Sequence, residues 1–131
     1  MMKRGMLLFA HGARDPNWAV PFEEVAMLVR QRLPTAMVKL AYLEFMTPSL
    51  PDAGRALVQA GCEHIEVVPL FLGAGGHVRK DLPALLADLS KDFPNVHWNL
   101  RPAIGEVASV IEAMAAAAVQ GMQADASEAR S

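Results

Sequence analysis

The sequence predicts an α/β fold: a single three-layer domain in which helices cover both faces of a four-stranded parallel sheet. Apolar runs typical of buried strands alternate four times with segments of helical periodicity. The connections between these segments are short, which favours right-handed crossovers and parallel strands. The chain has 131 residues, a length that suits one domain. We therefore expect the strand order 2-1-3-4, which is half of a flavodoxin-like pattern.

The first strand is expected at residues 6–10, where five apolar residues precede His11. Asp15 and Pro16 then give a capping residue followed by proline, which is typical of a helix start. Large apolar residues recur at helical spacing from Trp18 to Leu33, and Pro34 ends the pattern.

The second strand is expected at residues 38–43, directly before Glu44. Ser49 is placed to cap the helix that follows. An apolar stripe then runs to Val58, and Gly61 predicts the end of this second helix.

The third strand is expected at residues 65–72 and the fourth at residues 96–101. Leucines at helical spacing between them predict the third helix, which Pro94 ends. A last helix is expected from about residue 106 to residue 120, so residues 1–120 form the domain and residues 121–131 a disordered tail.

The last helix is apolar nearly all the way round, and one four-stranded sheet can cover only one side of it. Two interpretations stay open. Its many alanines tolerate water and favour helix, or the helix forms a subunit interface.

Composition excludes several classes of protein. The chain is 53% hydrophobic and 20% charged with a net charge of −2, which is typical of a globular protein and argues against a nucleic-acid partner. The single cysteine, Cys62, cannot form an internal disulfide, so we expect a cytoplasmic protein in which Cys62 is a small core residue. We expect no membrane span, because no apolar run reaches about 18 residues.

Three potential metal ligands follow three of the strands. His11 and Glu44 come directly after the first two, and His77 follows the third across a glycine-rich loop. Ligands of open α/β sheets bind at the carboxyl edge, so these side chains are expected to converge there. Two imidazoles and a carboxylate suit a divalent transition metal such as cobalt, iron or nickel. His64 and His97 lie away from this edge and are interpreted as structural.

The loop before His77 contains Gly73, Gly75 and Gly76. It matches neither a dinucleotide fingerprint nor a P-loop, and it favours close approach of the backbone to a large flat ligand. Cationic residues gather near the same edge and indicate an anionic, polycarboxylate ligand, unless they are merely solvated: Arg14, Arg79, Lys80 and Arg101.

With these motifs assembled, the sequence resembles the small CbiX-type sirohydrochlorin chelatases, which belong to the class II tetrapyrrole chelatases. The resemblance runs from about Arg4 to Val119 and rests on three motifs in order. These are the segments 9–16, 42–50 and 68–83, which contain His11, Glu44 and His77 respectively. One departure is Ala13, which stands where the family usually has serine.

The resemblance implies a chelatase that inserts a divalent metal into sirohydrochlorin, in cobalamin or siroheme biosynthesis. It implies that His11, Glu44 and His77 bind the metal and act in catalysis, and that short chains pair as homodimers. No permanently bound cofactor is expected, since the metal, Co²⁺ first and otherwise Fe²⁺ or Ni²⁺, is a substrate. The tetrapyrrole is expected to contact the segments around these ligands: Arg14, Phe45, Met46, Leu72, Gly75, Gly76, Val78 and Arg79.

Two other functions compete with this one. A metal or tetrapyrrole carrier would use the same residues without turnover. A histidine-type phosphatase would normally have arginine directly before the histidine, but here Ala10 precedes His11.

Overall fold

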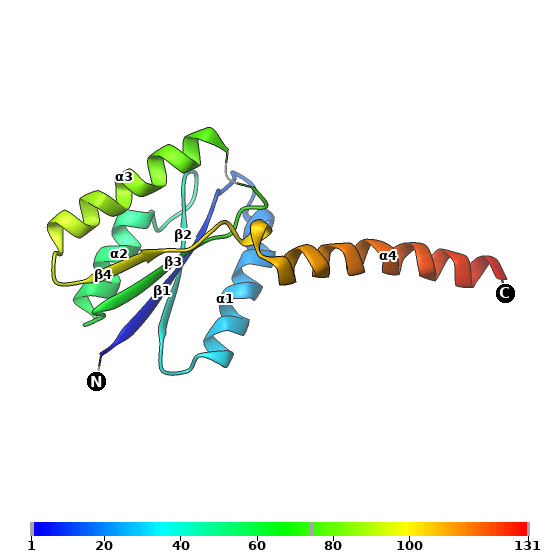
Figure 1. The fold of residues 1–131 in the computed structure, drawn as a ribbon, viewed down its shortest axis with the longest axis horizontal. Coiled ribbons are helices and arrows are strands. Elements are labelled where there is room, and N and C mark those ends of the chain that lie inside the picture. Colours follow the sequence, from blue (N-terminus) through cyan, green and yellow to red (C-terminus); the bar gives the residue numbers. More distant parts are fainter. Residues whose placement is uncertain (1, 74, 131) are drawn as a thin grey trace.

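The computed structural model describes residues 2–73 and 75–130, with the side chains of His77, Val78 and residues 124–130 left outside the description. A parallel sheet of four strands in the order β2-β1-β3-β4 forms the centre (Figure 1). This confirms the predicted fold and the order 2-1-3-4. The strands are β1 Arg4–Ala10, β2 Met37–Tyr42, β3 His64–Pro69 and β4 His97–Leu100.

The helices follow the strands in alternation. They are the 3₁₀ turn η1 Pro16–Ala19, α1 Val20–Arg32, α2 Leu50–Gln59, α3 Gly76–Asp92, the 3₁₀ turn η2 Ile104–Glu106 and α4 Ala108–Arg130. Both predicted caps are confirmed: Asp15 accepts a hydrogen bond from the Asn17 amide, and Ser49 accepts one from the Asp52 amide. The first helical segment begins as a 3₁₀ turn, and Pro21, which has no N–H to donate, occupies the first turn of α1.

One face of the sheet carries α2 and α3 and holds the main core. Leu7 and Phe9 of β1 and Ile65 and Val67 of β3 point to this face, because alternate residues of a strand share one side. They pack against leucines of both helices: Leu50, Leu57, Leu82, Leu86 and Leu89. Cys62 belongs to the same core, and its burial raises the pKa of the thiol although the nearby charge of Lys3 opposes the shift. Its predicted core position is confirmed.

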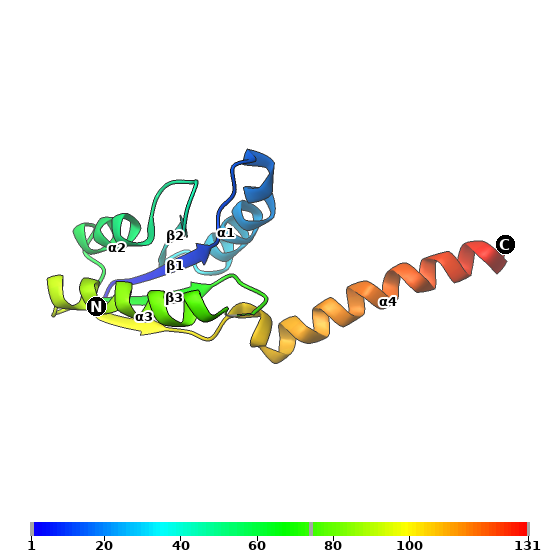
Figure 2. The ribbon, with the colours of Figure 1, turned by 90° about the horizontal axis from the view of Figure 1, so that it is seen from above.

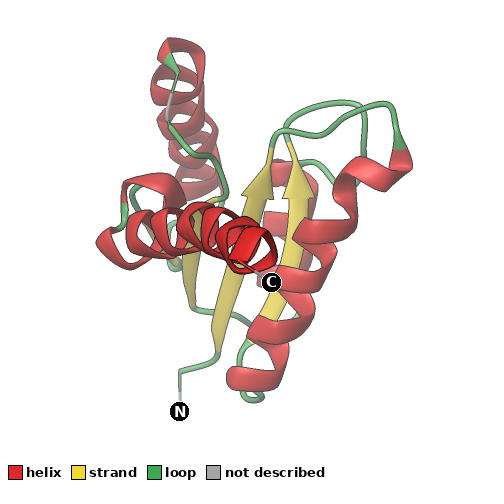
Figure 3. Ribbon diagram, turned by 90° about the vertical axis from the view of Figure 1, so that its right-hand side faces the viewer, coloured by secondary structure: helices red, strands yellow, loops and turns green. Residues whose placement is uncertain are grey.

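The opposite face carries α1, so helices lie on both sides of the strands (Figure 3). Ala26 of α1 packs against Leu8 of β1 and Val38 of β2. Within the described part of the chain, no helix covers this face of β3 and β4, and the exposed surface there forms a groove.

The last helix leaves the domain instead of packing on the sheet (Figure 2). It extends to Arg130, beyond the predicted end near Gln120, because its run of alanines continues into residues that also tolerate helix. The assignment of residues 121–131 to a separate tail stays a prediction. Over the described residues, no helix is both long and apolar enough to cross a membrane.

Candidate active site at the carboxyl edge of the sheet

Two of the three predicted ligands meet at the carboxyl edge. His11 follows β1 directly, Glu44 follows β2 by two residues, and β1 and β2 are hydrogen-bonded neighbours. The Nε2 atom of His11 lies 3.0 Å from Oε1 of Glu44, with the two side chains 52% and 49% exposed. A carboxylate only accepts, so the ring N–H donates, and Nδ1 of His11 makes no hydrogen bond to a described residue. This pair is therefore open to solvent and to a ligand.

The backbone around Gly12 brings the two loops together. The Leu43 amide donates to the Ala10 carbonyl and the Glu44 amide donates to the His11 carbonyl, at 3.0 and 3.1 Å. Gly12 has a φ of +92°, and a Cβ atom there would collide with the Glu44 carbonyl oxygen. Only glycine combines this conformation with this close approach. The His-Gly sequence thus positions Glu44 as well as His11.

Phe45 continues the site in a strained conformation. It is the non-glycine residue with positive φ, at 65°, in the described chain, and such strain is often found at functional sites. The guanidinium carbon of Arg14 lies 5.1 Å from the centre of the Phe45 ring, a cation–π distance. A pocket of about 410 Å³ includes both residues together with Met46 and Ala13. Met46 is half-buried against Tyr42 and Ala19, so much of its surface already packs within the protein.

Tyr42 borders this pocket and the pocket described below. Burial, with the negative charge of Glu23 adding to it, raises the pKa of the Tyr42 phenol above its ordinary value of 10.0. The hydroxyl therefore stays protonated near neutral pH and is available as a hydrogen-bond donor.

The glycine-rich loop leads into α3, whose first turn contains His77. Hypothetical Cβ atoms at Gly73, Gly75 and Gly76 would meet no atom of the described residues within 4 Å, so the described surroundings leave space beside this backbone. Such space suits the predicted approach of a flat ligand. The side chains of His77 and Val78 lie outside the described residues, and their predicted roles stay predictions.

The predicted cationic residues do not form one group. Arg14 lies beside Phe45, whereas Arg79 and Arg101 border a separate pocket of about 230 Å³. A guanidinium nitrogen of Arg79 is 3.7 Å from Glu106, and both residues are exposed, so this ion pair is weak. Leu72 is 71% exposed, which is unusual for a leucine.

Sequence analysis missed Phe71 as a site residue. Its buried ring lies edge-on to the imidazole of His11, with ring centres 6.4 Å apart, and also contacts Phe9. Phe71 thus supports one side of the His11 ring. The signal in the sequence is its place at the end of the third apolar run, close to the carboxyl edge of the sheet.

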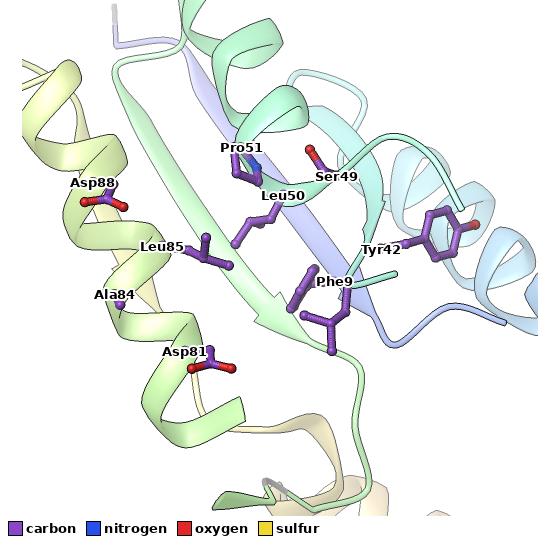
Figure 4. Close-up of a pocket in the computed structure, with 10 residues that line it drawn as sticks. Phe9, Tyr42, Ser49, Leu50, Pro51, Asp81, Ala84, Leu85 and Asp88 are labelled. Atoms are coloured by element: carbon purple, nitrogen blue, oxygen red, sulfur yellow. The ribbon is translucent and has the colours of Figure 1, made fainter. Parts of the chain in front are cut away.

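A pocket of about 440 Å³ between the β2–α2 loop and α3 was also not predicted (Figure 4). Asp81 and Asp88 of α3 line one side of it, and Ser49 and Pro51 line the other. The two carboxylates are seven residues apart, which places them on the same face of a helix. That spacing is visible in the sequence, but nothing there indicates which surface faces them.

No group of three His, Cys, Asp or Glu side chains is placed to hold a metal ion among those that the structure describes. The described part of the site supplies two ligands, His11 and Glu44. Two ligand atoms that each lie about 2.1 Å from a metal ion and at right angles are about 3.0 Å apart. The observed separation of 3.0 Å therefore suits a pair that exchanges its shared proton for a metal ion.

Comparisons with known proteins agree on one family. The family model described as CbiX matches residues 5–120 of this chain. The sirohydrochlorin cobaltochelatase of Sulfurisphaera tokodaii is 33% identical over 65% of this chain and 69% of its own length. The chloroplastic sirohydrochlorin ferrochelatase of Arabidopsis thaliana is 30% identical over 77% of this chain. The match covers 45% of the Arabidopsis protein, so this chain spans less than half of that relative.

A solved structure agrees in fold. The CbiX protein from Marinobacter aquaeolei VT8 superposes with a TM-score of 0.80 and 32% identity, over 92% of this chain and 98% of the other. Nearly the whole of that protein is thus matched, including the four-stranded sheet.

Proposed function

Because this chain belongs to the CbiX family, we propose that it is a sirohydrochlorin chelatase, an enzyme that inserts a divalent metal ion into this tetrapyrrole. The observation that carries the proposal is the contact between His11 and Glu44 at 3.0 Å, open to solvent at the edge where α/β folds bind ligands. Relatives named as cobaltochelatase and ferrochelatase support the substrate. We propose Co²⁺ as the preferred metal, with Fe²⁺ or Ni²⁺ as alternatives, and no permanently bound cofactor.

Metal insertion sets three tasks. The metal ion must shed water, two pyrrole N–H protons must leave, and the macrocycle must bend so that its nitrogen lone pairs face the metal. Each pyrrole N–H that loses its proton forms a nitrogen–metal bond with the electron pair left behind. The two protons go to bases of the protein or to water.

We assign the first two tasks to the predicted ligands. His11 is proposed to bind the metal ion through Nε2, where the ion replaces the proton shared with Glu44, and to accept a pyrrole proton once the ion has entered the macrocycle. Glu44 orients the imidazole and offsets the charge of the incoming metal. His77 is proposed as the second base, from across the glycine-rich loop. A site with so few protein ligands releases its metal readily, as insertion requires.

The remaining predicted residues are proposed to bind the tetrapyrrole. Arg14 and Arg79 meet peripheral carboxylates, while Phe45, Met46, Leu72 and Val78 contact the ring plane. Gly75 and Gly76 leave room for the macrocycle, as the open space beside them supports. We further propose a homodimer, because the match covers only 45% of the Arabidopsis enzyme and a second copy would supply a comparable remainder. We propose a cytoplasmic location because the single cysteine, Cys62, is a free thiol.

An absorbance assay tests the function. Sirohydrochlorin and Co²⁺, Fe²⁺ or Ni²⁺, each in turn under anaerobic conditions, should give the spectrum of the metallated product with many turnovers per chain. The variant His11→Ala should lose about 10²–10⁴-fold in rate, which is the range for general acid–base groups. The matched control His97→Ala changes an exposed histidine at the opposite edge and should keep the rate. Binding of metal or tetrapyrrole without turnover would favour a carrier instead.

A further inference from the structure

The open face of the sheet and the last helix of the same chain both expose apolar surface. The floor of the groove is formed by Met6 and Leu8 of β1 together with Val68 and Leu70 at β3. Val25 and Val29 of α1 form one wall, and the groove has a volume of about 750 Å³. We call this surface the open groove. A contiguous apolar hollow of this size is typical of an interaction site.

The second surface is a stripe along α4. Its large apolar residues lie within one half of the helix circumference, and the opposite arc holds mostly alanine and polar residues. We call this set the α4 stripe: Val110, Ile111, Met114, Val119 and Met122. Ile111 is 50% and Met122 72% exposed, and the main contact of α4 with the rest of the described chain is with η2, where the helix begins.

The junction before α4 directs the helix away from the open groove of its own chain. The Gly105 amide donates to the Phe71 carbonyl at 2.9 Å, and a Cβ atom at Gly105 would collide with the backbone of Leu72. The η2 turn is thus held against the end of β3. Val107 accepts hydrogen bonds from the Val110 and Ile111 amides, so α4 continues directly from this turn. Figures 1 and 2 show the helix leaving the domain in both views.

We propose that the open groove binds α4 of a second copy of this chain, and that two chains exchange these helices reciprocally. The inference rests on the proposed homodimer and names the surfaces that form it. The open groove and the α4 stripe belong to the same chain. In a twofold-symmetric dimer, each chain can therefore bury its α4 stripe in the open groove of the other, as in dimers formed by exchange of an identical element. At 1.5 Å per residue, the 23 residues of α4 span about 35 Å, which is long enough to leave one domain and cross another.

Charge favours a protein partner over a lipid surface. Helices that lie on membranes are rich in lysine and arginine, whereas α4 has Glu112, Asp125 and Glu128 against the single Arg130. The rim of the open groove includes Arg101, whose side chain is 58% exposed. The groove also includes Leu72, so a helix bound there lies beside a residue proposed to bind the tetrapyrrole.

Paired variants test the two surfaces by light scattering. The wild-type chain should have twice its 14.1 kDa mass at micromolar concentration. Val25→Glu places a charge on the exposed wall of the groove, and Met114→Glu places one on the α4 stripe. Each should weaken dimerisation by at least about tenfold, since buried apolar anchors dominate such interfaces. Circular dichroism should show that both variants stay folded, because both positions are exposed in the single chain.

Each variant has a control on the same helix. Leu28→Glu changes an exposed residue of α1 that does not line the groove, and Ala116→Glu changes the opposite arc of α4, so both should remain dimeric. A monomeric wild-type chain would overturn the inference. So would a dimer that Met114→Glu dissociates and Val25→Glu leaves intact, because α4 would then pair with α4.

The assay of metal insertion separates this inference from the proposed function. A dimer that behaves as expected but never turns over sirohydrochlorin would contradict the function and leave the helix exchange standing. A monomer that inserts metal into sirohydrochlorin would support the proposed function and contradict the helix exchange.

Discussion

Two histidine–glutamate pairs with the same chemistry occupy opposite ends of this sheet. His11 and Glu44 are about half exposed at the carboxyl edge, whereas His64 and Glu66 are only 18% and 20% exposed near the amino edge. The half-buried pair also has further partners: Asn99 donates to Glu66 at 2.7 Å, and the His64 ring stacks on that of His97. Exposure and place in the fold thus separate a pair available to a ligand from a pair that ties β3 to β4.

His11 and His77 are expected to act as one unit in metal insertion. If both accept pyrrole protons around the same metal ion, the double variant His11→Ala/His77→Ala should be little slower than the worse single variant. Glu44→Gln should cost less, because it keeps a hydrogen-bond partner for His11 and removes mainly charge. Initial rates at subsaturating metal measure this. Additive losses in the double variant would mean that the two histidines act independently.

Glu66 should make stability depend on pH. Burial raises the pKa of its carboxyl, but hydrogen bonds from His64 and Asn99, with the charge of Arg101, outweigh burial and hold the pKa below its ordinary value of 4.5. A lowered folded pKa means that the ionised group stabilises the fold above about pH 4.5, and that this contribution is lost as pH falls through the folded pKa.

The variant Glu66→Gln measures that contribution. Urea unfolding at one protein concentration should show it less stable than the wild type by about 1–2 kcal/mol at pH 7, with the difference shrinking below pH 4.5. Glu24→Gln, at an exposed position of α1, should differ little from the wild type at any pH. A difference for Glu66→Gln that grew toward low pH would mean that the folded state raises, and does not lower, the pKa of Glu66.

At the scale of elements, the sequence predicted the features that depend on a few neighbouring residues, namely the strands and the helix starts. Apolar runs predicted the four strands, and Asp15 and Ser49 predicted helix starts, because a strand face or a cap is decided within a few residues. Contacts between residues far apart in the sequence were not predicted. Phe71 against His11 and Gly105 against Leu72 join segments whose meeting no periodicity records. The positive φ of Phe45 was not predicted either, because it lies in a tight turn, closed by the Met46 amide donating to the Glu44 carbonyl at 2.8 Å, that no glycine marks in the sequence.

The variant Gly12→Ala tests whether the close contact between the loops after β1 and β2 positions Glu44 for metal insertion. Gly12→Ala should strain a backbone with φ +92° and push its new Cβ into the Glu44 carbonyl, so metal insertion should fall at least as far as in Glu44→Gln. Gly61→Ala is the matched control. Gly61 has φ +98°, but its Cβ would meet only the Lys3 side chain, at 3.6 Å. Both variants should lose about 1–3 kcal/mol of stability.

Only Gly12→Ala should lose activity beyond what its stability explains. Rates measured well below the unfolding transition of each variant give this comparison. Equal losses of rate in Gly12→Ala and Gly61→Ala would show that general destabilisation, not the Glu44 contact, causes the effect.

At the scale of the whole molecule, the sequence did not predict that helices would cover the two faces of the sheet unequally. Two helices cover one face, and α1 alone covers half of the other. The sequence left two interpretations of the last helix open, an alanine-rich helix that tolerates water or a subunit interface. It could not indicate the direction of α4, which follows from the contact of Gly105 with the end of β3.

If two chains exchange their α4 helices, thermal stability should depend on protein concentration. If α4 of one chain covers the open groove of another, unfolding separates the chains, and the melting temperature Tm must rise with protein concentration. A hundredfold increase, from about 1 to about 100 µM, adds roughly 2.7 kcal/mol per dimer, which corresponds to a rise in Tm of about 5 °C for chains of this size. Calorimetry across this range measures the shift. Met114→Glu should melt at one temperature throughout, because its charge on the α4 stripe prevents the exchange, whereas Ala116→Glu should follow the wild type. A wild-type Tm independent of concentration would mean that each domain is stable with its groove uncovered, and that α4 contributes nothing to holding two chains together.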